Sequence, residues 1–327
     1  MSDTVPLGSA PLLAVDGFSV RLRLPYGELH ACENVSFDLQ AGESLGVVGE
    51  SGSGKSVTML SMMGLIRGRK EGTLHFKGAR MEDLSPLRGR DVSMVFQNPL
   101  NSLNPSLRIG KQLTEVLTEH LGLGRREAEK RVLSMMERLA VPEPDKLMRR
   151  YPFEYSGGMR QRVMIAMAML CEPDLLIADE PTTALDVTNQ AQILHLFREL
   201  QERFGTSLIF ISHDLSVVSQ IAHRVMVMYA GAMMEMGPSE TLFRTPLHPY
   251  TRGLIDSLPR LLPGERKKPL ASIPGTMPSL IAPPRGCRFS PRCPQAQERC
   301  ALQAPKAVRR ADRTVCCWLY AEGGGPR

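Results

Sequence analysis

A glycine-rich octapeptide, residues 49–56, has the composition and spacing of a phosphate-binding loop. It matches the pattern Gly-x-x-x-x-Gly-Lys-Ser/Thr and stands between a short apolar run at 44–48 and a predicted helix that starts near Lys55. Glycines let successive backbone N–H groups turn toward one anion, and the first turn of the helix adds partial positive charge. We expect Lys55 to contact the β- and γ-phosphates of a nucleotide and Ser56 to bind Mg²⁺. The expected nucleotide contacts are Gly49, Ser51, Gly52, Ser53, Gly54, Lys55 and Ser56.

Two carboxylates, Asp179 and Glu180, follow a second apolar run at 175–178. Asp179 would stand at the carboxyl end of a buried strand, where ligands gather in a parallel sheet, so we expect it to bind Mg²⁺. Glu180 is the candidate group to polarise an attacking water. Taken alone, an apolar run followed by Asp-Glu is equally compatible with a structural role. The phosphate loop in the same chain favours the catalytic interpretation.

A second anion-binding pattern, Ser156-Gly157-Gly158, precedes a predicted helix. Ser156 is suited to cap the helix, and the two glycines allow an anion to approach the backbone closely. By itself a Ser-Gly-Gly tripeptide indicates only a loop.

The elements that must position these residues indicate an α/β fold. Alternating apolar runs between Leu13 and Leu39 predict antiparallel strands at the N-terminal end. Alternating strands and helices further along predict a parallel sheet, with strands at 175–178, 208–212 and 225–229 and a helix at 188–204. Between them, helices are expected at 109–121, 125–140 and 159–170, so a helical subdomain of about 105–170 is inserted into the α/β body.

Charge and cysteine content divide the 327-residue chain at about residue 257. Residues 258–327 hold 13 Lys and Arg against 4 Asp and Glu, a net charge of +9, whereas residues 1–257 carry −3. The last 41 residues hold five of the seven cysteines. The basic charge therefore belongs to a tail, 258–327, and does not indicate that the body of the chain, 1–257, binds nucleic acid. No run reaches the roughly 20 apolar residues of a membrane helix, so the chain is not expected to span a bilayer.

These motifs together resemble those of ATP-binding-cassette ATPases. Residues 155–162 are similar to the signature peptide of that family, with Tyr155 and Met159 in place of the commoner Leu and Gln. The resemblance implies that this peptide completes the ATP site of a partner subunit. It also implies a RecA-like parallel-sheet core, an N-terminal antiparallel β subdomain, an inserted helical subdomain and an irregular Cys-rich tail.

The same resemblance implies roles for four further residues. They are Gln97, which contacts Mg²⁺ or water and relays closure to a transport channel; Asp186, at the dimer seam; His213, which senses the γ-phosphate; and Tyr26, which stacks on adenine. A histidine at a strand end is otherwise more often a capping or core residue. An aromatic before a glycine is also ordinary in a turn.

Within the family, residues 101–105 (Asn-Ser-Leu-Asn-Pro) and 248–251 (His-Pro-Tyr-Thr) resemble ATPase subunits of dipeptide, oligopeptide and nickel importers. The resemblance implies ATP-driven uptake of di- or oligopeptides, with nickel or another small solute as the alternative. It implies a second ATPase subunit, a paralogue in a heterodimer, two transmembrane permease subunits and an extracytoplasmic solute-binding protein. The chain would then lie at the cytoplasmic face of the cell membrane, with no nucleic-acid partner.

The tail cysteines have spacings that fit neither zinc-binding pairs nor ferredoxin runs. The stretch 287–294, however, resembles a Cys-x-Phe-x-Pro-Arg-Cys-Pro tail that holds a 4Fe-4S cluster in some importer ATPases. The cluster ligands that this resemblance implies are Cys287, Cys293, Cys300 and Cys317. Two alternatives remain open. Four thiolates would also suit zinc, and the cysteines could instead be free thiols without a metal.

Two other classes of protein share some of these features. A cassette ATPase that acts on nucleic acid or ribosomes usually has two cassettes or a long coiled coil, whereas about 100 residues without sustained heptads separate Lys55 from Ser156. A small-metabolite kinase would use the phosphate loop but leaves Ser156, Asp186 and His213 without a role. Both are less consistent with the sequence than a transport ATPase.

Overall fold

A computed structural model describes residues 10–97, 102–183, 185–258 and 272–321 of the chain. Asn101 of the importer-like stretch and parts of the tail, 259–271 and 322–327, lie outside the described residues.

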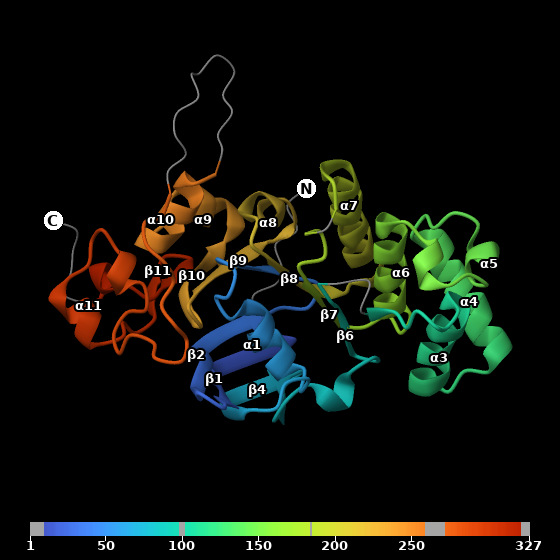
Figure 1. The fold of residues 1–327 in the computed structure, drawn as a ribbon, viewed down its shortest axis with the longest axis horizontal. Helices are drawn as coiled ribbons and strands as arrows, with labels where there is room; N and C mark the ends of the chain where they lie inside the picture. The colour runs from blue at the N-terminus through green and yellow to red at the C-terminus, as the bar shows by residue number, and fades with distance from the viewer. Residues whose placement is uncertain (1–9, 98–101, 184, 259–271, 322–327) are drawn as a thin grey trace, which may run out of the picture.

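The larger of two sheets runs through the middle of the molecule, in the order β11-β12-β10-β9-β3-β8-β7-β6 (Figure 1). Neighbouring strands from β9 to β6 are all parallel. Their bounds are β3 (Ser44–Val48), β6 (Val92–Val95), β7 (Leu175–Asp179), β8 (Ser207–Ser212) and β9 (Arg224–Tyr229). The antiparallel strand β10 (Ala232–Pro238) follows β9 in a hairpin. The parallel core predicted from the sequence is therefore confirmed.

The smaller sheet is antiparallel and has the order β2-β1-β4-β5. It contains β1 (Leu13–Leu24), β2 (Gly27–Leu39), β4 (Arg69–Phe76) and β5 (Ala79–Met81). The first two strands were expected from their alternating apolar residues. The sequence does not predict β4, because only Leu74 and Phe76 of this strand are buried and its first four residues are polar or glycine.

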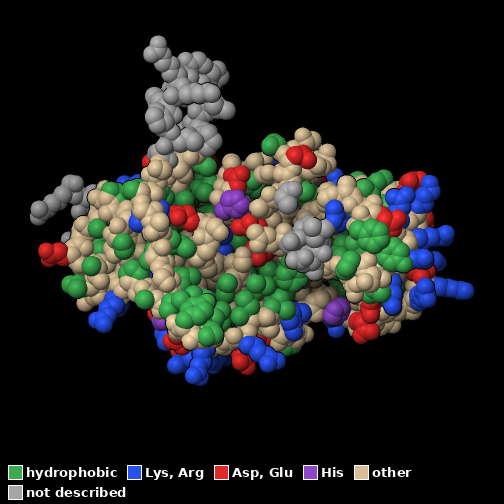
Figure 2. All heavy atoms as spheres, viewed as in Figure 1, with side chains coloured by type: hydrophobic (Ala, Val, Ile, Leu, Met, Phe, Trp, Pro, Cys, Tyr) green, Lys and Arg blue, Asp and Glu red, His purple; other side chains and the backbone are tan. Residues whose placement is uncertain are grey.

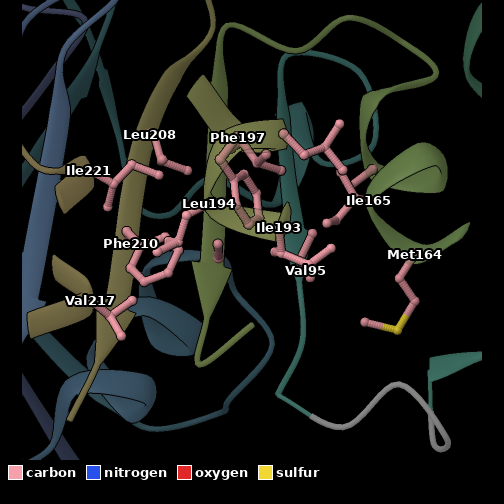
Figure 3. Close-up of a cluster of buried hydrophobic side chains, with 14 of the residues drawn as sticks. Val95, Met164, Ile165, Ile193, Leu194, Phe197, Leu208, Phe210, Val217 and Ile221 are labelled. Carbon is pink, nitrogen blue, oxygen red and sulfur yellow. The ribbon is translucent and has the colours of Figure 1, made fainter. Parts of the chain in front are cut away.

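Helices cover the two faces of the large sheet, and alternate strand residues point into two separate cores. One face packs on α7 (Val187–Phe204), α8 (Leu215–Ile221), α9 (Ser239–Arg244) and α10 (Pro249–Asp256); the other packs on α1 (Lys55–Met62) and the small sheet. In β8, Phe210 belongs to the first core and Ile211 to the second. Figure 3 shows Phe210 among side chains of α7 and α8, with Leu194 and Val217 next to its ring.

The helical subdomain lies at one end of the sheet, beyond β6 (Figure 1). It consists of α3 (Ile109–Leu121), α4 (Arg125–Arg138), α5 (Pro144–Leu147), the short 3-10 turn Pro152–Glu154 and α6 (Gly157–Met169). The three helices predicted here are confirmed. The second one ends at Arg138, two residues earlier than expected, because Ala140 has a left-handed backbone with φ of 51°.

The C-terminal region lies at the opposite end and contributes to the same sheet (Figure 1). It includes the 3-10 turns Ser290–Arg292 and Trp318–Tyr320, α11 (Glu298–Leu302), β11 (Val308–Arg310) and β12 (Arg313–Val315). Elsewhere in the chain, a 3-10 turn at Ser85–Leu87 precedes β6. β12 pairs with β10. The tail was expected to be irregular, whereas it contains one short helix and two strands. The sequence did not predict these strands because three residues are too few to show a periodic pattern.

None of the described helices has the length and apolarity that crossing a membrane requires. On the face shown in Figure 2, acidic and basic side chains are intermixed over α3–α5, at the right of the view.

Replacing Phe210 with Ala should destabilise the fold. The side chain is fully buried and its ring packs edge-on against Phe197 with the ring centroids 5.7 Å apart. We expect the free energy of unfolding to fall by about 3–5 kcal/mol, measured by urea denaturation. Phe153→Ala, at a position that is 68% exposed, is the control and should change it by less than about 1 kcal/mol. Equal effects of both substitutions would contradict the proposed core.

Candidate functional site

Four neighbouring parallel strands end at the same edge of the sheet, and each leads into a residue predicted to act on a nucleotide. The phosphate loop follows β3, His213 follows β8, Asp179 ends β7, and Gln97 lies just beyond β6. The carboxyl edge of a parallel sheet is where ligands bind in α/β proteins. Parallel register thus brings together residues that are up to 164 positions apart in the sequence.

The phosphate loop needs glycine at its two ends. A Cβ atom on Gly49 would lie 2.1 Å from the carbonyl oxygen of Met228, and one on Gly54 would lie 2.3 Å from that of Ala31. Both glycines have positive φ, 153° and 93°. Because Gly54 caps α1 without a side chain, the first N–H groups of that helix are left for an anion.

Lys55 is buried inside this loop, with 4% of its surface exposed. Its Nζ donates to the carbonyl oxygens of Gly49 and Glu50, at 2.8 and 2.9 Å. Burial lowers the pKa of Lys55, while the negative charges of Glu180, Asp179 and Glu50 oppose that change. The site therefore holds a cation surrounded by oxygen atoms, ready to pair with phosphate oxygens.

Ser56 and Asp179 form the pair of oxygen donors that Mg²⁺ would require. The hydroxyl of Ser56 donates to Oδ1 of Asp179 at 2.7 Å, which joins the start of α1 to the end of β7. Burial raises the pKa of Asp179, although the hydrogen bond from Ser56 lowers it. Hydroxyl and carboxylate oxygens are hard ligands that suit Mg²⁺, so this donor set fits the ion.

Glu180 lies at the centre of the remaining site residues, with its side chain 11% exposed. Its carboxylate accepts hydrogen bonds from Nε2 of Gln97 and Oγ1 of Thr183, both at 2.9 Å, and lies 3.2 Å from Nδ1 of His213. Its backbone is left-handed, with φ of 46°, a conformation that is unfavourable for a glutamate and is found often at functional sites. The structure thus brings Gln97, Glu180 and His213 together and adds Thr183, which the sequence does not single out.

The signature peptide begins α6, and the predicted dimer-seam residue begins α7. Ser156 caps α6 by accepting from the backbone N–H of Met159 at 3.4 Å. Asp186 caps α7 by accepting from Asn189, through the backbone N–H at 2.9 Å and the side-chain amide at 2.6 Å, and these hydrogen bonds lower the pKa of Asp186. A Cβ atom on Gly158 would lie 3.2 Å from Oδ1 of Asn189, so the two helix starts are neighbours. Asn189 has no motif that would have revealed this link.

Two predicted residues are not joined to the phosphate loop. Among the residues that the structure describes, no hydrogen bond connects Ser156 to that loop, and none connects Tyr26 to it. Tyr26 lies in the turn between β1 and β2 and is 72% exposed. An exposed position leaves both residues accessible to a second molecule.

The four predicted cluster ligands, Cys287, Cys293, Cys300 and Cys317, line one small cavity of about 10 Å³. Burial raises the pKa of Cys287 to about 11, and negative charge on the other three thiols contributes to this rise. Burial likewise raises the pKa values of Cys293 and Cys317. In the described part of the chain, however, no three His, Cys, Asp or Glu side chains are arranged to hold a metal ion. The donors fit a thiolate-bound centre in kind, but they do not form a ligand cage.

His248 lines the same cavity and has an unsatisfied donor. Burial lowers the pKa of His248 to about 3, so the ring is neutral at pH 7. Nδ1 accepts from the backbone N–H of Tyr250 at 3.0 Å, which leaves the proton on Nε2. Nε2 is buried and has no hydrogen-bond partner among the described atoms, a cost of about 1–3 kcal/mol. An acceptor such as a thiolate or a sulfide would remove that cost.

This sheet edge, with its phosphate loop, paired Mg²⁺ donors and central glutamate, defines a phosphate-loop nucleotide hydrolase. Comparison with known families matches residues 32–183 to the family described as ABC transporter. Residues 234–300 match the family described as oligopeptide/dipeptide transporter, C-terminal region.

Similar whole proteins are known. The chain is 48% identical over 319 residues to the oligopeptide transport ATP-binding protein OppD of Haemophilus influenzae, with 95% of this chain and 98% of that protein covered. It is also 48% identical to the dipeptide transport ATP-binding protein DppD of Bacillus subtilis, with 94% of each covered. The dimeric ATP-binding cassette MJ0796, bound to ADP and phosphate after hydrolysis, matches 69% of this chain and 98% of its own, with a TM-score of 0.62 and 25% identity. The chain belongs to the ABC transporter family and hydrolyses ATP.

Proposed function

We propose that the chain powers uptake of di- or oligopeptides through separate permease subunits. The observation that carries the ATPase part is the convergence of Lys55, Asp179, Glu180 and His213 at one sheet edge. The peptide part is supported by the C-terminal family match and by the similarity to OppD and DppD, whose names describe oligopeptide and dipeptide transport. Nickel or another small solute is the alternative cargo.

In this mechanism, backbone N–H groups of the phosphate loop other than that of Glu50 bind the phosphates of ATP, and Lys55 neutralises the β- and γ-phosphates. Ser56 and Asp179 would hold Mg²⁺, with the amide oxygen of Gln97 as a further ligand; the bound ion would supply positive charge beside the phosphates. Ser51, Gly52 and Ser53 line the turn around the β-phosphate. The burial of Lys55 supports these roles, because electrostatic interactions are stronger away from water.

Glu180 acts as the base in hydrolysis. It accepts a proton from a water whose oxygen attacks the γ-phosphorus as the bond to the bridging oxygen of ADP breaks. His213 and Gln97 orient the carboxylate and the attacking water, a role supported by their contacts with Glu180 at 3.2 and 2.9 Å. Contacts with Gln97, Thr183 and His213 hold the Glu180 carboxylate at the sheet edge.

The full site requires a second ATPase subunit, which we propose to be a paralogue. Ser156, Gly157 and Gly158 would bind the γ-phosphate held by that subunit, Asp186 would lie at the seam, and Tyr26 would stack on adenine. The exposure of Tyr26 and the lack of a described hydrogen bond from Ser156 to its own phosphate loop support this arrangement. The dimer would bind two permease subunits at the cytoplasmic face of the membrane and work with an extracytoplasmic solute-binding protein, without nucleic acid.

We also propose that residues 258–327 form a tail that follows the ATPase domain, 1–257, and packs against it, and that the four cysteines of the tail hold a 4Fe-4S cluster. Support comes from the cavity that Cys287, Cys293, Cys300 and Cys317 share and from the unpartnered Nε2–H of His248 beside it. Thiolate ligation would supply the acceptor that this donor lacks, since cluster sulfurs accept hydrogen bonds.

Glu180→Gln should stop turnover in the assembled importer. Because the amide cannot accept a proton, ATP stays bound in a closed dimer, and we expect ATP hydrolysis to fall about 100-fold or more. The measurements are phosphate release and uptake of labelled dipeptide into vesicles that contain all subunits. Unchanged turnover would exclude Glu180 as the base. Active wild-type vesicles that take up nickel but no peptide would instead exclude the peptide assignment.

Cys293→Ser should remove the cluster, because one of four thiolate ligands is lost. In protein purified without oxygen, we expect visible absorbance, iron and sulfide to be lost. Cys316→Ser is the matched control, since Cys316 does not line the cavity, and it should retain all three signals. Wild-type protein that contains zinc, or neither iron nor sulfide, would rule out the cluster.

A further inference from the structure

An arginine of the C-terminal region reaches the phosphate loop. Nη1 of Arg292 donates to both carboxylate oxygens of Glu50, each at 3.0 Å, and to the hydroxyl of Tyr229 at 3.2 Å. Its Nε and Nη2 donate to the carbonyl oxygens of Pro274 and Ile273, at 2.9 and 3.0 Å. The side chain is 6% exposed, so this guanidinium is enclosed and every one of its nitrogen atoms has a partner.

Glu50 is the second residue of the phosphate loop, and both its backbone and its side chain are hydrogen-bonded. Its backbone N–H donates to the hydroxyl of Tyr250 at 3.0 Å, and its carbonyl oxygen accepts from Lys55. Its negative charge is one of those that act on Lys55. The carboxylate therefore stands near the place where phosphates would bind, and Arg292 provides its positive partner.

The C-terminal region also reaches the loop indirectly, through residues 230 and 231, and directly, through Met277. Nη1 of Arg288 donates to the carbonyl oxygen of Ala230 at 2.6 Å, and the next residue, Gly231, donates its N–H to the carbonyl oxygen of Ser53 at 2.8 Å. The methyl carbon of Met277 lies 3.1 Å from the position of a Cβ atom on Gly52. The C-terminal region thus packs next to Gly52 of the phosphate loop and contacts a segment that is hydrogen-bonded to Ser53.

We propose that Arg292 is a positioning residue for nucleotide binding, so that the C-terminal region sets the affinity of the phosphate loop for Mg-ATP. The inference rests on the proposed function of that loop. Without Arg292, the Glu50 carboxylate would be partly enclosed without a positive partner and would repel a triphosphate nearby. The loop would also lose the contact that holds its second residue. Both effects should weaken ATP binding, although neither Arg292 nor the Glu50 side chain contacts ATP itself.

A double-mutant cycle between Arg292 and Glu50 tests this proposal in the full chain. Arg292→Gln should weaken Mg-ATP binding about tenfold, measured by titration calorimetry, because the repulsion from Glu50 becomes uncompensated. In a Glu50→Gln background, the same change should alter the dissociation constant less than about twofold, because the repelling charge is gone. Arg309→Gln, at an exposed arginine of the same region, is the control and should bind ATP like wild type.

The cycle distinguishes positioning from simple anchoring of the region. Equal weakening by Arg292→Gln in both backgrounds would overturn the proposal, and so would unchanged affinity in the presence of Glu50. If thermal unfolding shows that Arg292→Gln does not fold, Arg292→Lys replaces it; we expect about threefold weaker binding with Glu50 and none of that loss with Gln at position 50. Wild-type protein that binds no Mg-ATP would instead refute the proposed function of the loop.

Discussion

The structure depends on placing one ammonium group, that of Lys55, inside a loop that closes around it. A buried cation is unfavourable unless oxygen atoms and negative charges surround it. The carbonyl oxygens of Gly49 and Glu50 provide the oxygen atoms, while Asp179 and Glu180 at the end of β7 provide charge. This requirement explains why β3 and β7 lie close together, with only β8 between them, in one parallel sheet. Burying the Lys55 ammonium group is unfavourable when no phosphate is bound, and this same group is the one that pairs with the phosphate oxygens of ATP.

The C-terminal region extends this arrangement of charges rather than standing apart from it. Arg292 forms an ion pair with Glu50 of the phosphate loop, and the next residue in the sequence, Cys293, lines the cysteine cavity. Phe289 is buried, lines the cysteine cavity and packs edge-on against Tyr229, with ring centroids 5.2 Å apart. β12 also pairs with β10 of the large sheet. The tail and the nucleotide site therefore share one packed core.

Local sequence patterns predicted the parts of the site that local physics determines. The phosphate loop needs glycines at Gly49 and Gly54 for steric reasons, and buried strands such as β7 are continuous apolar runs, so both were visible in the sequence. The sequence did not predict β4, β5, β6, β10, β11 or β12. Four of them, β5, β6, β11 and β12, are only three or four residues long, and β4 is mostly exposed. β10 is buried, but Glu235 and Gly237 interrupt its apolar run. The contact between Arg292 and Glu50 joins residues 242 positions apart, and no spacing rule could reveal it.

In the proposed mechanism, the buried Lys55 cation provides the main attraction for the phosphates of ATP. The most direct test is the dissociation constant of Mg-ATP for the Lys55→Met protein, measured by titration calorimetry beside wild type. Methionine keeps the length and packing of the side chain but has no charge. We expect Lys55→Met to bind Mg-ATP about 100-fold or more weakly than wild type, with an unchanged unfolding midpoint. An unchanged dissociation constant would contradict it.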